Sequence, residues 1–132
     1  MKILVGTLYS GENEYEECIA SIQNQSIGAS EHLIIRDLPD KEAHRVLYQN
    51  FTARKSQFDL LIKVDADMVL SRNDLFANIV NWMNEHSNVS LLAIGVLDFF
   101  SGQLINGMNS YRNTVVWDFD KDTIFTDIPE ID

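Results

Sequence analysis

Two patterns of hydrophobic and polar residues alternate along residues 1–97. Short apolar runs are typical of buried strands, and apolar residues spaced three and four apart are typical of helices that pack on a sheet. The predicted strands cover residues 2–7, 32–36, 60–64 and 89–97, and the predicted helices cover residues 12–25, 41–56 and 75–83, the last capped by Ser71 or Asn73. Strands that alternate with helices in this way indicate a mostly parallel sheet with helices on both faces.

From Asp98 onward the pattern changes. Short β-prone pieces at residues 103–108, 114–117 and 123–128 alternate with Gly, Asn and Asp, and no further strong helical pattern is present. We therefore expect a single α/β domain over residues 1–132, with a three-layer, Rossmann-like core in residues 1–97. Residues 98–132 would add a short β-rich segment.

Composition narrows the classes of function. The net charge of −10 opposes binding to nucleic acid, because long-range repulsion acts against it. No run approaches the ~18 apolar residues that a membrane span needs, so none is predicted. A single cysteine, Cys18, excludes an intramolecular disulfide, and we expect a cytoplasmic protein. An acidic protein can still bind a diphosphate if a metal ion neutralises the charge between them.

Two aspartates, Asp65 and Asp67, close the apolar run Leu60–Val64. Residues two apart on an extended chain point the same way, so both carboxylates can converge on one site. A hard divalent cation relieves their repulsion, and Mg²⁺ or Mn²⁺ would take its remaining ligands from water and phosphate. The motif is common by chance, and one aspartate starting a turn while the other is solvated remains an open alternative.

Flanking segments match a known pattern. The stretch Cys18–Ser26 contains the sequence S-I-Q-N-Q-S, Thr7–Ser10 follows the first apolar strand, Asp37 ends the second, and Asn50 precedes the Asp65–Asp67 pair. In order and spacing, these features resemble family 2 glycosyltransferases of the GT-A fold, over about residues 2–97. The resemblance implies a GT-A-like domain, with a nucleotide-sugar-binding core in residues 1–97 and a partial acceptor-side region in residues 98–132.

The resemblance also implies a site for a UDP- or GDP-sugar donor and a saccharide or other hydroxyl acceptor. Its nucleotide-sugar-binding residues would be Thr7, Tyr9, Asp37, Asn50 and Asp65. Asp37 would accept a hydrogen bond from the base, Asp65 would lie near the ribose or the metal, and Asp67 would be the most direct ligand of Mg²⁺ or Mn²⁺.

The sequence departs from this pattern in ways that leave the activity open. Met68 replaces an acidic residue that often follows the motif. The catalytic base is unknown: Asp98, Asp118 and Asp120 are weak candidates, and the surface preference of carboxylates favours a solvated loop residue at each position. The prediction is a metal-dependent glycosyltransferase domain, and the alternative is a nucleotide-sugar-binding module or fragment without transfer activity.

Other classes fit less well. A nucleotidyltransferase of related fold would have a Gly- and Arg-rich phosphate loop after the first strand, and Gly6 and Gly11 have no arginine near them. Trp82 and Trp117 either cover a sugar ring or pack in the core. A partly exposed aromatic group in a short domain can also mark a homodimer interface.

Overall fold

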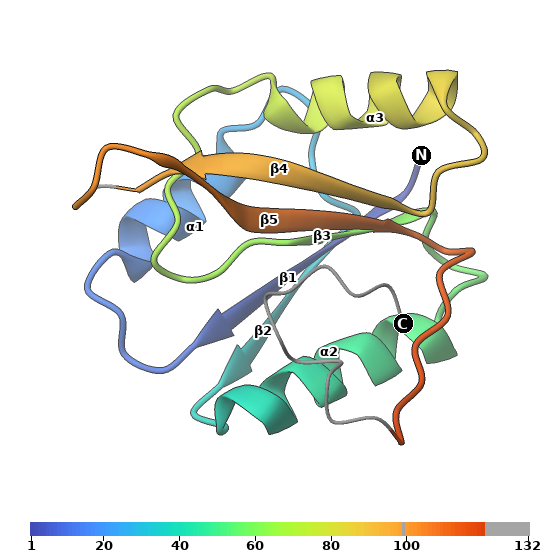
Figure 1. The fold of residues 1–132 in the computed structure, drawn as a ribbon, viewed down its shortest axis with the longest axis horizontal. Helices are drawn as coiled ribbons and strands as arrows, with labels where there is room; N and C mark the ends of the chain where they lie inside the picture. Colours follow the sequence, from blue (N-terminus) through green and yellow to red (C-terminus); the bar gives the residue numbers. More distant parts are fainter. Residues whose placement is uncertain (99, 121–132) are drawn as a thin grey trace.

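A mixed five-stranded sheet organises the computed structural model, which describes residues 1–98 and 100–120 (Figure 1). The strands are β1 (Ile3–Tyr9), β2 (Glu31–Arg36), β3 (Leu60–Lys63), β4 (Leu91–Leu97) and β5 (Leu104–Arg112), in the order β2-β1-β3-β5-β4. β1 pairs in parallel with β2 and β3, whereas β5 is antiparallel to both β3 and β4. The sheet is therefore mixed rather than mostly parallel. The connection between β4 and β5 is short, and a short connection joins antiparallel strands.

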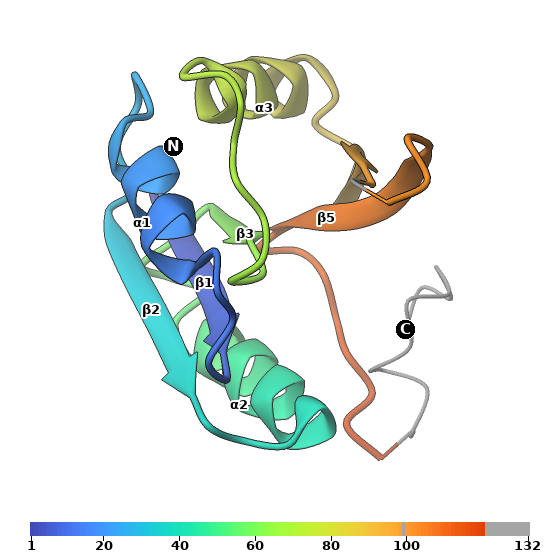
Figure 2. The ribbon, with the colours of Figure 1, turned by 90° about the vertical axis from the view of Figure 1, so that its left-hand side faces the viewer.

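Three helices pack on the sheet: α1 (Tyr15–Gln23), α2 (Asp40–Ala53) and α3 (Leu75–Glu85). Figure 2 shows α1 and α3 on one side of the strands and α2 on the other. Successive strand residues point to opposite faces. Accordingly, Ile3 and Val5 belong to the core that includes α1 and α3, while Leu4 belongs to the core that includes α2.

A helix lies directly against the sheet at Gly6. A Cβ atom at this position would lie within 2.8 Å of Leu47 Cδ2, and Leu47 is fully buried on α2. Glycine therefore allows α2 to sit directly against β1.

Several local predictions need correction. The N-cap of α3 is Asp74 rather than Ser71 or Asn73, and its neighbour Arg72 binds the Asp74 carboxylate. The piece at residues 114–117 is not a strand, because Val115 leaves the sheet and packs in the core with α2. The piece at residues 123–128 lies outside the described residues. In the described part of the chain, no helix is both long and apolar enough to cross a membrane.

Both tryptophans pack against neighbouring rings. Trp117 stacks on Tyr48 with 4.5 Å between ring centroids, and Trp82 stacks on His86 with 3.9 Å. Each also packs against a core cluster. These contacts favour the packing interpretation over a role in covering a sugar ring.

Candidate functional site

The Asp65–Asp67 pair lies in a tight turn directly after β3. The Met68 N–H donates to the Asp65 carbonyl at 2.9 Å, which closes the turn, and the Ala66 N–H donates to the Leu8 carbonyl at 3.3 Å. The Ala66 side chain is buried and anchors the turn to the domain. The two carboxylates are therefore held at the carboxyl ends of β1 and β3, the edge where open α/β sheets bind ligands.

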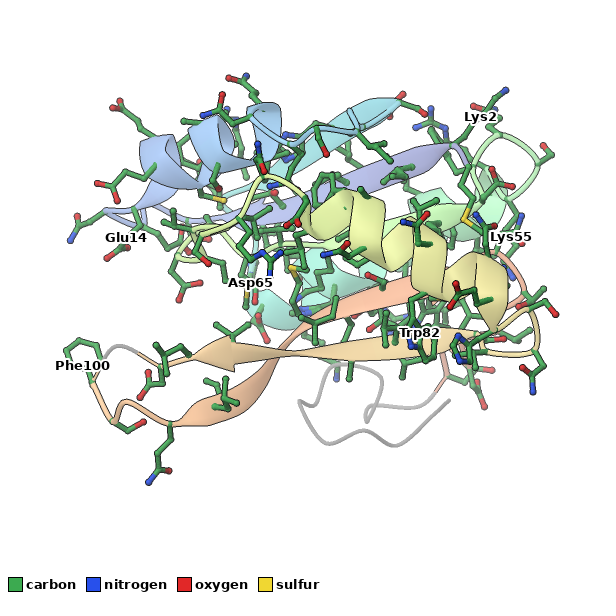
Figure 3. The ribbon with its side chains drawn as sticks, turned by 90° about the horizontal axis from the view of Figure 1, so that it is seen from above. Lys2, Glu14, Lys55, Asp65, Trp82 and Phe100 are labelled. Carbon is green, nitrogen blue, oxygen red and sulfur yellow. The ribbon has the colours of Figure 1, made fainter. Side chains whose placement is uncertain are left out.

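A cleft of about 210 Å³ opens beside this turn, between the strand ends and the first residues of α2. Its lining residues are Leu8, Tyr9, Ser10, Glu12, Ile35, Leu38, Asp40, Ala43, Asp65 and Asp67. Four of these are carboxylates, and none is lysine or arginine. In Figure 3, Asp65 lies toward the same end of the molecule as Glu14, whereas Lys2 and Lys55 lie at the other end.

Asp67 has a raised pKa in this arrangement. Partial desolvation is the main effect that raises the pKa of Asp67, followed by the nearby Asp65 carboxylate, with smaller contributions from Glu12 and Glu14. A raised carboxyl pKa means that the charged form is disfavoured where it stands. A bound cation would reverse this penalty, because it would favour the charged form.

Asp65 has a cationic partner that the sequence interpretation missed. Lys63 is buried at the end of β3, and its ammonium nitrogen lies 2.7 Å from Asp65 Oδ1. The signal was present in the sequence, since residues 63 and 65 share one face of an extended chain. Lys63 partly neutralises Asp65, and among the described residues no lysine or arginine forms an ion pair with Asp67.

Two of the predicted nucleotide residues lie at or near the mouth of the cleft. Tyr9 lines it, and its ring packs against Tyr15 in a tilted arrangement with 3.9 Å between centroids. Asp37 follows β2 in the left-handed backbone region, with φ of 56°, and its N–H donates to the Tyr9 carbonyl at 2.9 Å. The exposed Asp37 carboxylate is not part of the cleft lining.

Thr7 and Asn50 lie elsewhere. Thr7 is fully buried, and its hydroxyl is hydrogen-bonded to the His32 ring at 2.8 Å. Asn50 accepts a hydrogen bond from Arg54, which also donates to Glu31 at the beginning of β2. Asn50 thus lies near the amino ends of the strands, away from the cleft, because α2 runs back from the strand ends toward the strand starts. Neither residue lines the cleft.

The candidate catalytic bases do not line the cleft either. The Asp98 carboxylate accepts the Ser101 N–H at 2.9 Å, and hydrogen bonding to Ser101 lowers the Asp98 pKa. Asp118 and Asp120 are exposed, with Asp118 Oδ1 accepting the Asp120 N–H. All three have the surroundings of solvated loop residues.

Glu12 and Asp40 are the cleft carboxylates that the sequence analysis did not single out. Glu12 accepts the Ser10 N–H at 2.7 Å in the loop after β1, and Asp40 is the first residue of α2. Both follow strand ends, as Asp65 and Asp67 do. Their position after strands could have indicated that Glu12 and Asp40 belong to the site, although no motif surrounds either residue.

The residues present fit a divalent cation only in part. Within residues 1–98 and 100–120, no group of three or more His, Cys, Asp or Glu side chains is placed to hold a metal ion. Mg²⁺ typically binds one or two protein carboxylates and takes further ligands from substrate phosphates and water. Asp67, with Asp65 beside it, matches that incomplete protein set.

Comparisons with known proteins identify the fold but no family. No protein-family model and no curated protein matches the sequence. A197 from STIV has a similar structure, with a TM-score of 0.64 and 14% identity over 85% of this chain; the chain spans 65% of A197. CMP:2-keto-3-deoxy-manno-octonic acid synthetase complexed with CTP matches with a TM-score of 0.57 and 9% identity, over 86% of this chain and 75% of the synthetase. These similarities support an α/β, Rossmann-like fold, and the glycosyltransferase family remains a prediction from the sequence.

Proposed function

We propose that this chain is a metal-dependent glycosyltransferase domain that binds a nucleotide-diphosphate sugar in the cleft beside Asp65 and Asp67. The observation that carries the proposal is the turn that holds both carboxylates next to a cleft lined by acidic groups. A diphosphate brought into such a cleft is repelled unless a divalent cation lies between the two sets of charges. Metal dependence thus follows from the charge of the lining.

The roles of the residues follow from their positions. Asp67, with Asp65, would hold Mg²⁺ or Mn²⁺ against the diphosphate, and Tyr9 and Asp37 would lie toward the nucleoside of a UDP- or GDP-sugar. A bound cation would stabilise the charge on the diphosphate leaving group as the bond to the sugar breaks. A saccharide or other hydroxyl acceptor would complete the transfer. The fold shared with a CTP-bound synthetase is in keeping with a nucleotide ligand.

A second function is favoured by one observation. None of the candidate bases Asp98, Asp118 and Asp120 lines the cleft, so none of the three is placed beside the proposed donor site to act as a base. A nucleotide-sugar-binding module without transfer activity would need none.

Thermal unfolding with ligands tests the binding claim. With Mn²⁺ and UDP or GDP at about 100 times Kd, binding should add roughly 2.7 kcal/mol to the free energy of unfolding. Asp67→Asn should remove most of this gain, whereas the exposed control Asp118→Asn should keep it. Without metal, Asp67→Asn should raise the melting temperature, because it removes a partly desolvated charge and its repulsion by Asp65, the two main causes of the raised Asp67 pKa. If Asp67→Asn then shows no stabilisation by Mn²⁺ and nucleotide, the loss cannot be attributed to a variant that fails to fold.

Product release separates the two functions. A glycosyltransferase should release nucleoside diphosphate faster when an acceptor is present, and a binding module should not. If neither UDP nor GDP shifts the melting temperature with Mg²⁺ or Mn²⁺, the proposed site itself is wrong.

A further inference from the structure

The outer edge of β4 presents an unpaired row of backbone groups. The Arg112 N–H donates to the Ser90 carbonyl and the Asp98 N–H to the Gln103 carbonyl, each at 2.8 Å. In an antiparallel pair such contacts recur at every second residue. Even-numbered residues from 90 to 98 therefore bond to β5. The residues that turn their N–H and C=O groups to the open edge are Leu91, Ala93, Gly95 and Leu97.

A β-bulge in the hairpin does not interrupt this row. Ile94 pairs with Met108 and Gly95 with Asn106, so the extra residue is Gly107, on β5. β4 keeps its regular alternation throughout. Among the described residues, no hydrogen bond reaches the outward backbone groups of β4.

The two edges of the sheet differ in how they are protected. β2, at the other edge, begins and ends with the charged residues Glu31 and Arg36, and Glu31 pairs with Arg54 at 2.6 Å. β4 has seven residues without a charge or a proline. Natural proteins usually block an exposed edge with one of these features, because an unprotected edge pairs with another strand.

We propose that the β4 edge pairs antiparallel with β4 of a second copy of this chain, about a twofold axis at Ile94. Positions 93 and 95 lie equally far on either side of 94, as do positions 91 and 97. Ala93 therefore meets Gly95 of the second copy, and Leu91 meets Leu97 of the second copy. Every outward N–H and C=O group of one copy then faces an outward group of the other.

Charge and side chains fit a second copy. Each chain carries a net charge of −10, yet the seam brings two neutral strands together and sets no carboxylates against each other. On the face opposite α3, Leu97 and Leu104 are 67% and 76% exposed, next to the small residues Ala93 and Gly95. These apolar groups would be partly covered across the seam.

The size of the seam sets the expected strength. Seven residues span about 23 Å, and such a strip buries less than the roughly 800 Å² per partner of a standard interface. The dimer is accordingly weak and depends on concentration. The two β4 strands run in opposite directions, so the carboxyl ends of the strands in the two copies point opposite ways. The two clefts therefore lie far apart and bind ligand independently.

Sedimentation across a range of concentrations tests the seam. The wild-type chain should shift from one to two chain masses as its concentration rises. Ala93→Pro removes an outward N–H that makes no bond to β5, so the fold should stay intact. The lost pair of hydrogen bonds per dimer should weaken association at least about tenfold.

Ala93→Val is the matched control, because it changes the same side chain but keeps the N–H. It should dimerise like the wild type. A wild-type chain that is monomeric at every concentration overturns the proposal. So does an Ala93→Pro variant that folds and associates as tightly as Ala93→Val.

Cysteine cross-linking tests the register. Ile94 would lie opposite itself, at a Cα–Cα distance of about 4.5 Å that a disulfide can bridge. Ile94→Cys should oxidise to a dimer, whereas Leu92→Cys should not, since the two copies of residue 92 would be about 13 Å apart. Cys18 adds no background, because it is buried and its pKa is raised to about 11. Equal cross-linking of the two variants, or none with Ile94→Cys, contradicts the proposed register.

Discussion

The ammonium nitrogen of Lys63 lies 2.7 Å from Asp65 Oδ1, so at the scale of single residues it competes with any cation for that carboxylate. Lys63→Met should release Asp65 and tighten Mn²⁺ binding in the absence of nucleotide by about tenfold, or 1.4 kcal/mol. The same change should cost about 1–2 kcal/mol of stability, since Asp65 remains partly exposed and can be solvated. Titration calorimetry with Mn²⁺ measures the first effect and urea unfolding the second.

Lys2→Met is the control for net charge, because Lys2 lies at the opposite end of the molecule from Asp65 (Figure 3). It should leave Mn²⁺ binding nearly unchanged. If Lys63→Met weakens Mn²⁺ binding instead, Lys63 orients Asp65 for the metal rather than competing with it.

His32 gives the fold a defined dependence on pH. Burial lowers the pKa of His32 below its ordinary value of 6.5, and its ring is hydrogen-bonded to the buried Thr7. The unfolded chain then binds the proton more readily than the folded chain does. The stabilising contribution is fully present above pH 6.5 and is lost as the pH falls through the lower folded-state pKa.

The free energy of unfolding should therefore fall between about pH 7.5 and pH 5, and His32→Gln should make that fall shallower. Urea unfolding at several pH values measures the slope. His86→Gln serves as the comparison, because His86 lies after α3, bonded to the Trp82 carbonyl, and should leave the His32 contribution in place. An equal slope in wild type and His32→Gln would contradict the assignment.

Site residues could be predicted from the sequence only where they belong to a local motif. Asp65 and Asp67 could be found because a motif follows a buried strand. Glu12 and Asp40 were missed because they carry no motif, although both line the cleft. Val46 on α2 is apolar and shares a helical spacing pattern with Ala43 and Leu47, yet it is 42% exposed, because a helical pattern alone does not fix how wide the buried stripe is.

At the scale of elements, the contact between α2 and β1 depends on Gly6. Gly6→Ala would push a methyl group into Leu47, which is fully buried and has little room to move. The change should cost about 1–3 kcal/mol, the usual range for overpacking a core. Urea unfolding measures the loss.

Gly28→Ala is the matched control for Gly6→Ala, because a Cβ at residue 28 meets nothing within 4 Å. It should change stability little. Equal effects of the two substitutions would show that backbone entropy, and not the contact with Leu47, explains the use of glycine.

Strands and helices were largely predictable from the sequence, and their arrangement was not. The apolar runs located β1, β2, β3 and β4 to within a few residues. The insertion of β5 between β3 and β4 depends on pairing between distant segments, which no local pattern encodes. The position of Asn50 depends on the direction in which α2 runs. Asn50 is ten residues beyond the start of α2, which places it about 15 Å along the helix and away from the strand ends.

At the scale of the whole molecule, the net charge of −10 and the neutral β4 edge make opposite contributions to self-association. Two acidic copies repel at long range, while the proposed seam contains no ion pair that salt could weaken. Sodium chloride shortens the screening length from about 10 Å at 0.1 M to about 3 Å at 1 M, so it should reduce the repulsion and leave the seam intact. We therefore expect the dimer to tighten severalfold over this range in sedimentation experiments. Ala93→Pro should remain far weaker at both concentrations, which separates pairing through β4 from general salting-out. A dimer that weakens as salt rises would instead be held by ion pairs, and the acidic copies would then have to meet through their few basic residues rather than through β4.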